Sequence, residues 1–449
     1  MLSMSALIER LKAALKDPVS GQLLRGSGLS MAIRVVGLVI GFLSHMVLSR
    51  TLGADQYGQY AVALGWALVL VLPARLGLDN AALRLATIYV EEDRLGQLRG
   101  LIRFAAAVMT ISSLIIAAAL LALHAIGFSL FRGATATILL WMIAIIFPLA
   151  ALGVVSVLLR AARRILASQV YEQLLRPVVL IAGCGAFALT RIELSASAAL
   201  MITAVATGVA LAGALLHFRT VFPNLSRHPP ETNERGQWLS LSWPLFLIGT
   251  VQEVMNQIDI ILLGQLASTS DAGHYAAAWR LASLVVFALV AITAISAPMI
   301  AWAHRRNDRA ELARIARLNA RLALAFSLGM TIFLAAIGPY ALRLFGPGFD
   351  DAYPALLVLL LAGMVNAFTG SVAYLMTMTG RQQLALAIFG SSLLVSIVLN
   401  VLLIPPLGTL GAAIASASGT ILWNVAMLVY VRRQFGIDAS AFGFRVRSE

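Results

Sequence analysis

Twelve separate stretches of mostly apolar residues run through this chain, and they constrain its fold more than any single motif does. A helix needs about 20 apolar residues to cross the hydrocarbon core of a bilayer, which is about 30 Å thick. We therefore predict an all-α polytopic membrane protein whose spanning helices have these limits: 29–50, 58–80, 103–125, 134–158, 172–190, 196–218, 240–265, 274–301, 319–341, 354–378, 384–404 and 409–431.

The composition excludes other classes of protein. Of the 449 residues, 60% are hydrophobic and 12% are charged, whereas a soluble domain has about 25% charged residues and a disordered chain has low hydrophobicity. The single cysteine, Cys184, excludes an intramolecular disulfide and a cysteine metal cluster. The sequence contains no Walker loop, no G-x-S-x-G motif and no clustered zinc-ligand pattern, so we expect a protein that is not an enzyme.

The net charge of +13 would suggest a nucleic-acid partner on a soluble protein. Of the 33 basic residues, however, 26 fall on one side of the predicted membrane, four on the other, and three inside the runs. The positive-inside rule then places both termini in the cytoplasm. Most of the charge thus reflects topology, and no nucleic acid is expected. The four basic residues assigned to the loop after the fourth run are Arg160, Arg163, Arg164 and Arg176.

Short matches at one constant offset predict an internal duplication. Gly58-Gln59-Tyr60-Ala61 matches Gly273-His274-Tyr275-Ala276, 215 residues later, and Asp93-Arg94 matches Asp308-Arg309 at the same offset. Six spans per half make the two pseudo-repeats parallel, with the symmetry axis between them. The predicted organisation is a cytoplasmic amphipathic segment (1–28), a six-helix bundle (29–219), a cytoplasmic linker (220–238), a second six-helix bundle (239–432) and a cytoplasmic tail (433–449).

Ionisable residues inside spanning helices are costly and usually functional or paired. Arg34 and His45 are eleven residues apart, so an α-helix brings them to one face, near Gly37 and Gly41. This narrow cationic stripe suits an anion. Two alternatives stay open: Arg34 could snorkel to the interface, and His45 could be an ordinary packing residue.

Two further sites carry arginine. Arg75 and Asp79 have the i, i+4 spacing of a helical ion pair, which is either structural or, with the neighbouring Arg84, part of an anion site at the cytoplasmic mouth. Arg280 lies inside the eighth run, and its counterpart at the repeat offset is Gly65. A lone arginine there breaks the symmetry between the halves, as a site for an asymmetric anion requires.

The seventh run is the most polar. Its polar residues share an arc of about 160° on an ideal helix: Gln252, Glu253, Asn256, Gln257 and Asp259. Buried carboxylates beside amides suit a site for H⁺ or Na⁺, or they neutralise Arg34 or Arg280. We predict Glu253, Asp259, Asn256 and Asp79 as ion-coupling or counter-charge residues.

Two motifs resemble a known family. The stretch Leu48-Ser-Arg-Thr-Leu-Gly-Ala-Asp-Gln-Tyr-Gly-Gln-Tyr60, and Leu76-Gly-Leu-Asp79 followed by Arg84, are similar to the opening signature of bacterial polysaccharide flippases. These belong to the multidrug/oligosaccharidyl-lipid/polysaccharide exporter superfamily. The motif match covers about residues 25–105, and the topology covers nearly the whole chain. Lipid II flippases of this superfamily usually have two more helices than the twelve predicted here.

The resemblance implies a flippase of the bacterial inner membrane. Such proteins move undecaprenyl-diphosphate-linked oligosaccharides between leaflets for O-antigen lipopolysaccharide, capsule or exopolysaccharide, by alternating access and in some cases with H⁺ or Na⁺ coupling. A cationic cavity would bind the diphosphate, and our candidates for it are Arg34, Arg75, Arg84, Arg280 and His45. The implied partners are the lipid-linked oligosaccharide, the bilayer, and the polymerase and chain-length proteins. No cofactor is implied.

Two alternatives remain. A cation-coupled multidrug exporter of the same superfamily would need an acidic, aromatic cavity, which the membrane arginines disfavour. A polymerase or ligase would need a large loop on the far side, where the longest predicted loop is only about 343–353.

Overall fold

The computed structural model describes residues 18–130, 133–189, 193–306 and 308–443, and these ranges contain helices and turns but no strand. The first half of the chain forms α2 (Pro18–Arg75), α3 (Leu78–Glu91), α4 (Leu95–Ala125), α5 (Ala136–Ala161), α6 (Ile165–Gln169), the π-helix η1 (Val170–Leu175), α7 (Arg176–Leu189) and α8 (Ala196–Val221). The second half forms α9 (Arg235–Leu266), α10 (Thr269–Arg305), α11 (Arg309–Arg343), α12 (Tyr353–Thr369), α13 (Val372–Met378) and α14 (Gln382–Phe435). Short 3₁₀ turns are η2 (Leu225–Arg227) and η3 (Phe349–Ala352).

The number of spanning segments agrees with the number of apolar runs. Ten helices of the described chain are long and apolar enough to cross a membrane. Two of them, α2 and α14, are each two helices joined at a kink, at Gly53 (φ 71°) and Gly408 (φ 53°). Glycine adopts positive φ at little cost because it has no Cβ. Division at these kinks gives twelve segments and confirms the predicted all-α membrane fold.

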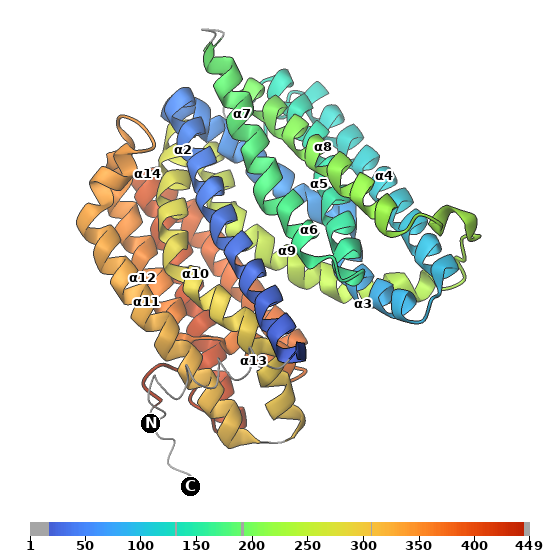
Figure 1. Ribbon diagram of the computed structural model, residues 1–449. Coiled ribbons are helices and arrows are strands. Elements are labelled where there is room, and N and C mark those ends of the chain that lie inside the picture. The colour runs from blue at the N-terminus through green and yellow to red at the C-terminus, as the bar shows by residue number, and fades with distance from the viewer. Residues whose placement is uncertain (1–17, 131–132, 190–192, 307, 444–449) are drawn as a thin grey trace.

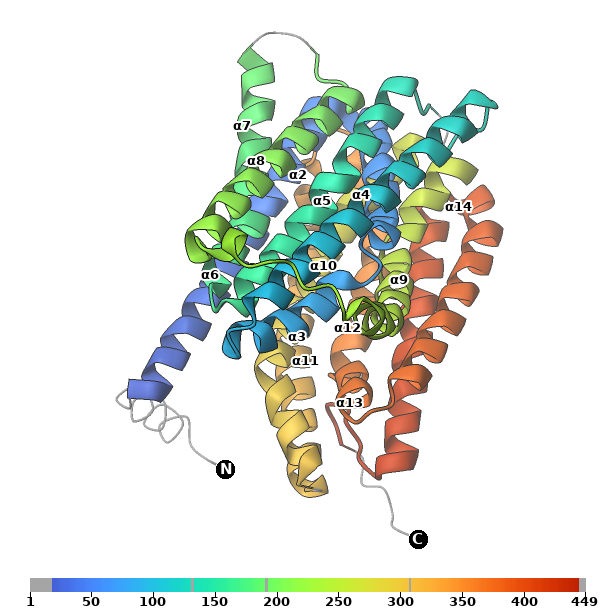
Figure 2. The same cartoon turned by 90° about the vertical axis from the view of Figure 1, so that its right-hand side faces the viewer.

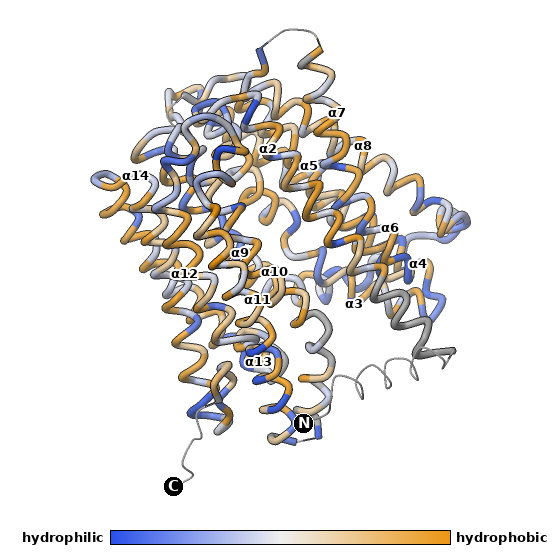
Figure 3. Tube along the Cα trace, turned by 60° about the vertical axis from the view of Figure 1, so that its left-hand side comes forward, coloured by the Kyte–Doolittle hydropathy of each residue, from blue (hydrophilic) through white to orange (hydrophobic). Residues whose placement is uncertain are grey.

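The outer surface of the helices is apolar. Figure 3 shows hydrophobic residues along the middle of the helices and hydrophilic residues mainly toward their ends. Leu114, Ile332 and Leu394 are more than 60% exposed. So much exposed apolar side chain is stable in lipid rather than in water. The chain is therefore a multi-pass membrane protein.

The helices form two groups. Figure 1 shows α4, α5, α7 and α8 in one group and α10 to α14 in the other, and the groups diverge toward the end at which α2 begins. In Figure 2 the start of α2 and the end of α14 lie toward the same end of the molecule. Residues 1–17 of the predicted amphipathic segment (1–28) lie outside the described residues. The rest of that segment, from Pro18, belongs to α2.

The two halves touch at a pair of glycines. A Cβ atom on Gly58 of α2 would lie 1.6 Å from the carbonyl oxygen of Thr269, and one on Gly273 of α10 would lie 2.2 Å from that of Ala54. Asp55 accepts a hydrogen bond from Thr269 beside them. Gly58 and Gly273 are the residues that match at the repeat offset. The two halves therefore approach closely at the residues that match, and the duplication stays a prediction.

The second predicted run, 58–80, is wrong at its end. Helix α2 stops at Arg75 because Leu76 (φ 48°) and Gly77 (φ 72°) leave the right-handed helical region. The chain beyond the turn forms α3, which packs against α9. At the turn the two elements are close, because a Cβ on Gly77 would lie 2.4 Å from the carbonyl oxygen of Ser242 in α9. The predicted pair of Arg75 and Asp79 does form, at 3.4 Å, but across this turn rather than along one helix.

The segment that joins the halves is fixed to the first half. The backbone N–H of Glu231 donates to the Gly96 carbonyl at 3.0 Å. The hydroxyl of Tyr89 in α3 donates to Glu234. The same hydroxyl accepts from Nε1 of Trp238 at 3.0 Å. Burial, and then the hydrogen bond to Glu234, raise the pKa of Tyr89 to about 12. A single tyrosine thus ties α3 to the start of α9.

Part of the predicted tail packs on the second half. Nε of Arg321 in α11 donates to the Ala441 carbonyl at 2.9 Å, and the N–H of Ala441 donates to the Phe368 carbonyl at 3.1 Å. Ile437 and Ala439 are buried. The described stretch after α14 therefore covers the ends of α11 and α12.

Candidate functional site

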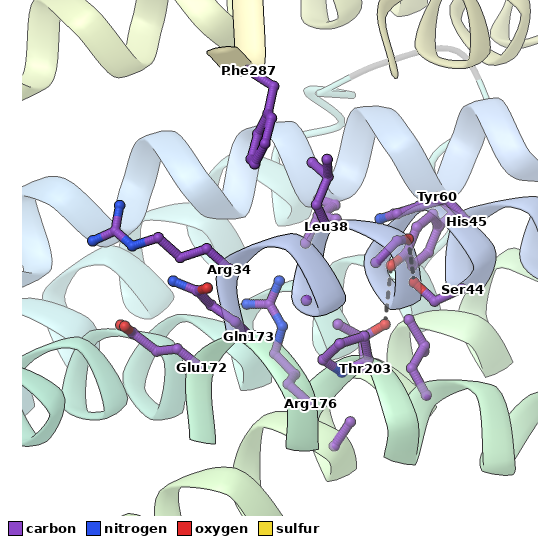
Figure 4. A pocket seen from close by; sticks show the side chains of 16 residues that line it. Arg34, Leu38, Ser44, His45, Tyr60, Glu172, Gln173, Arg176, Thr203 and Phe287 are labelled. Atoms are coloured by element: carbon purple, nitrogen blue, oxygen red, sulfur yellow. Dashed lines mark hydrogen bonds between the residues drawn. The ribbon is translucent and has the colours of Figure 1, made fainter. Parts of the chain in front are cut away.

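A cavity of about 360 Å³, here called the N-half cavity, lies where α2, η1, α7 and α8 meet (Figure 4). Its volume is in the range of about 300–1,000 Å³ that is usual for small-molecule sites. Phe287 of α10 reaches it from the second half (Figure 4). It is lined by Arg34, Gly37, Leu38, Gly41, Ser44, His45, Tyr60, Leu64, Glu172, Gln173, Arg176, Pro177, Leu180, Thr203, Ala206 and Phe287.

One face of α2 supplies the predicted cationic stripe. Arg34, Gly37, Gly41 and His45 all line the cavity, as their helical spacing predicts. A Cβ on Gly37 would lie 2.9 Å from Cβ of Gln173, whereas one on Gly41 would have no neighbour within 4 Å. Gly37 therefore lets η1 approach α2 closely, and Gly41 leaves open space inside the cavity.

The opposite wall contains the π-helix η1, residues Val170–Leu175. Pro177 has no N–H, so the carbonyl of Gln173, four residues earlier, has no α-helical donor. A π-turn has wider i to i+5 bonding and often marks a functional site. Here the wide turn brings Glu172, Gln173 and Arg176 to the same cavity.

Arg176 is a candidate that the sequence reasoning missed. The topology count places it in the loop after the fourth run, whereas it begins α7 and lines the N-half cavity. Figure 4 shows its side chain between those of Gln173 and Thr203. Within the described chain its guanidinium has neither an ion-pair partner nor a hydrogen bond. The signal that could have found it is its position inside the fifth run, directly before Pro177.

The deep end of the cavity is aromatic. The ring of His45 lies 6.3 Å from that of Tyr57 and 6.2 Å from that of Tyr60, and the Tyr60 hydroxyl is 3.2 Å from the Thr203 hydroxyl. Nδ1 of His45 is buried with no hydrogen-bond partner in the described structure. Nε of Arg280, from α10, donates to the Tyr57 hydroxyl at 3.1 Å. Arg280 thus lies beside the cavity end rather than in its lining.

The other two candidate arginines lie elsewhere. Arg75 pairs with Asp79 and donates from Nη2 to the Leu149 carbonyl at 2.6 Å, so it holds the end of α2 against α5. Arg84 is exposed on α3 and does not line the N-half cavity. Neither position is part of the N-half cavity.

The polar residues of the seventh run separate in the structure. Gln252 and Asn256 line a second cavity, in the other half. Glu253 accepts from Gln257 at 2.9 Å, one turn along α9. Asp259 is buried and accepts from Tyr275 at 2.9 Å and from Asn400 at 2.7 Å. In the described chain neither carboxylate pairs with Arg34 or Arg280, so the predicted neutralisation is wrong.

The N-half cavity suits an anion. Two guanidinium groups and an imidazole line it against one carboxylate, Glu172. Arginine donates paired hydrogen bonds in a planar fork that matches phosphate oxygens. Within the described residues, no group of three or more His, Cys, Asp or Glu side chains converges to hold a metal ion.

Comparison with known sequences finds two similarities. A sequence model of the family described as polysaccharide biosynthesis protein matches residues 23–304. The probable flippase AglR of Haloferax volcanii is 28% identical over 171 residues, which are 37% of this chain and 36% of AglR. The matched region thus spans about a third of the length of this relative.

Two solved structures share the fold over most of the chain. An inward-facing multidrug resistance transporter of the MATE family, in the MOP superfamily, superposes with a TM-score of 0.74 at 14% identity, covering 91% of this chain and 98% of that one. The lipid II flippase MurJ, in an inward closed conformation, has a TM-score of 0.72 at 14% identity, covering 90% and 87%.

Proposed function

Because the chain belongs to the polysaccharide biosynthesis protein family, we propose that it is a flippase for an undecaprenyl-diphosphate-linked oligosaccharide in the bacterial inner membrane. The oligosaccharide would serve O-antigen lipopolysaccharide, capsule or exopolysaccharide assembly, where polymerase and chain-length proteins act next. Both termini would lie in the cytoplasm. The observation that carries the proposal is Arg176, which has no ion-pair or hydrogen-bond partner among the described residues, in a cavity that also contains Arg34 and His45.

In this proposal the N-half cavity holds the diphosphate. Arg34 is exposed at the side chain, so it meets the anion first, and Arg176 binds it farther in. The guanidinium groups replace water around the phosphate oxygens, which lowers the cost of leaving the aqueous phase. The polyprenyl tail stays in lipid. The apolar outer surface of the helices accommodates the tail, because apolar groups gain nothing by leaving hydrocarbon.

Alternating access would use the contact between the halves. In this structure the halves meet around Gly58 and Gly273. The hydrogen bond from Arg280 to Tyr57 also joins α10 to α2. The halves can separate at this place only if both contacts break. An anion that attracts Arg280 away from Tyr57 would therefore favour their separation. Differential contacts of this kind are what a substrate needs in order to shift a conformational equilibrium.

Coupling to H⁺ or Na⁺ is the remaining part of the proposal. Among the predicted acidic and amide residues, Asp259 has the environment that such a role requires, because it is a buried carboxylate surrounded by neutral side chains of Tyr275 and Asn400. Asp79 is already paired with Arg75, and Glu253 with Gln257. We therefore assign the coupling role to Asp259.

A second candidate is a cation-coupled multidrug exporter, which similarity to the MATE transporter favours. A cationic drug would have to enter a cavity in which Arg34 and Arg176 face one carboxylate. Like charges repel strongly in a medium of low dielectric constant. The lining of the cavity thus supports an anionic substrate.

The test is complementation of a strain that lacks the protein. We expect wild type and Arg84→Gln to restore surface polysaccharide, because Arg84 is exposed and outside the cavity. Arg176→Gln should fail to restore it at equal protein level, and the lipid-linked oligosaccharide should accumulate. Full restoration by Arg176→Gln would contradict the assignment. A deletion strain with normal polysaccharide and new sensitivity to cationic dyes would favour the exporter.

A further inference from the structure

A second cavity, here called the C-half cavity, lies among α9, α10, α12, α13 and α14 and has a volume of about 430 Å³. None of the described residues that line it is charged. Its polar lining consists of amides and hydroxyls, and its rings come from Trp279, Tyr374, Phe389 and Trp423. Its chemistry therefore differs entirely from that of the cationic N-half cavity.

The two cavities are lined by residues that match at the predicted repeat offset. The offset of 215 residues that relates Gly58 to Gly273 also relates Gly37 to Gln252 and Gly41 to Asn256. Each member of these last two pairs lines the cavity of its own half. Where the first half has glycine, the second half therefore has an amide side chain.

Three amides of the C-half cavity are free to bind a ligand. Within the described chain, the side chains of Gln252, Asn256 and Asn366 have no hydrogen-bond partner. Gln252 and Asn256 are exposed, and Asn366 is half-buried. An amide both donates and accepts hydrogen bonds, so it matches a hydroxyl group, which does the same. A set of free amides without charges thus suits a ligand rich in hydroxyls.

The rings supply the other half of a sugar site. The Phe389 and Trp423 rings pack with centroids 5.1 Å apart at 49°, which fixes the Trp423 ring at the cavity wall. The face of an aromatic ring is electronegative. The C–H groups on one face of a pyranose carry partial positive charge, so that face stacks on the ring while the hydroxyl groups point to the sides. Aromatic faces with amides beside them meet both needs of a pyranose.

We propose that the C-half cavity binds a neutral pyranose of the lipid-linked substrate while the N-half cavity binds its diphosphate. This inference rests on the proposed function. Each half then recognises a different part of one molecule. The tail in lipid, the diphosphate in one half and the sugar in the other would keep the substrate in register with both halves as they move.

The test uses the purified full chain and two soluble probes. The first is inorganic pyrophosphate. The second is a panel of methyl pyranosides (glucose, galactose, mannose, rhamnose, N-acetylglucosamine and N-acetylgalactosamine), detected by saturation-transfer NMR. The main variant is Gln252→Ala with Asn256→Ala, which removes two unpartnered exposed amides and so leaves the packing intact. Trp423→Ala is the second variant. Trp302→Ala is its control, because Trp302 is 47% exposed and stacks on Arg306 away from both cavities.

We expect at least one methyl pyranoside to bind the wild type. Its binding should fall at least about fivefold in the double amide variant and in Trp423→Ala, and should not change in Trp302→Ala or Arg176→Gln. Pyrophosphate should show the reverse pattern, with loss only in Arg176→Gln. No binding of any pyranoside to the wild type, or equal binding by the double amide variant, would overturn the inference. Unchanged pyrophosphate binding in Arg176→Gln would instead count against the diphosphate site of the proposed function.

Discussion

The two cavities, one in each half of the molecule, differ in their chemistry. In the first half, α2 presents Gly37, which lets η1 approach closely, and Gly41, which leaves open space, and Arg34 and Arg176 line the same cavity. In the second half, Gln252 and Asn256 take the equivalent positions and no described lining residue is charged. The helices that form the walls can stay equivalent while a few side chains decide which ligand fits. This difference is what the proposed substrate, with one charged and one neutral part, would require.

The largest expected effect comes from placing a glutamate in each cavity. Arg176→Glu should weaken pyrophosphate binding by more than about 100-fold, or about 2.7 kcal/mol, because it removes a charge-assisted donor and adds repulsion. Asn256→Glu, the matched change in the other half, should alter it by less than about threefold. Titration calorimetry on the purified chain measures both. Equal losses would show a general electrostatic effect rather than two separate sites.

The two carboxylates of α9 should differ in their contribution to stability. Asp259→Ala should lower the free energy of unfolding by about 2 kcal/mol, because it leaves the buried Tyr275 hydroxyl without its acceptor and removes one of the acceptors of Asn400. Glu253→Ala removes one bond to Gln257 and should cost less than about 1 kcal/mol. Thermal melting in detergent ranks the two. A larger loss for Glu253→Ala would contradict the claim that the buried hydrogen bonds of Asp259 stabilise the fold more than the bond of Glu253.

Alanine substitution of two glycines of α2 should have a smaller effect on stability. The effect should differ between Gly37, which packs against η1, and Gly41, which faces open space. Gly37→Ala should destabilise the chain by about 1 kcal/mol, since its Cβ would lie 2.9 Å from Cβ of Gln173. Gly41→Ala meets no atom within 4 Å and should be neutral or slightly stabilising. Melting of both variants tests this. A reversed order would mean that α2 and η1 pack differently.

The last effect concerns Tyr89, which ties α3 to the start of α9. The pKa of Tyr89 is about 12, above the value of about 10 for a free tyrosine. The folded state therefore holds this proton more tightly, and its stabilising effect is complete below about pH 10 and is lost as pH rises toward 12. Tyr89→Phe should lose less stability than the wild type between these two pH values. Parallel alkaline melting curves for both proteins would contradict this.

Much of the fold could be predicted from the sequence, because a spanning helix needs a stretch of about 20 mostly apolar residues and does not depend on any single one of them. The twelve spans follow from apolar length alone. The cationic stripe of Arg34 and His45 follows from helical periodicity, which depends only on local geometry. Both predictions concern one helix at a time.

The rest of the site depends on contacts that periodicity does not contain. Arg176 enters the cavity because a π-turn precedes Pro177 and changes the phase of the helix. Glu253, Asn256 and Asp259 share one arc of α9, yet they lie in three environments: Glu253 accepts from Gln257 of the same helix, Asn256 lines the C-half cavity, and Asp259 accepts from Asn400 of α14. A polar arc read from sequence therefore locates a functional helix without showing which neighbour each side chain meets.

The most direct test of the central claim is transfer of lipid between leaflets in proteoliposomes that contain the purified chain. The probe is a fluorescent oligosaccharide on undecaprenyl diphosphate, measured by quenching of the outer leaflet. The account predicts rapid transfer by wild type and Arg84→Gln, and at least about tenfold slower transfer by Arg176→Gln. Equal rates for wild type and Arg176→Gln would contradict the claim that the N-half cavity binds the diphosphate.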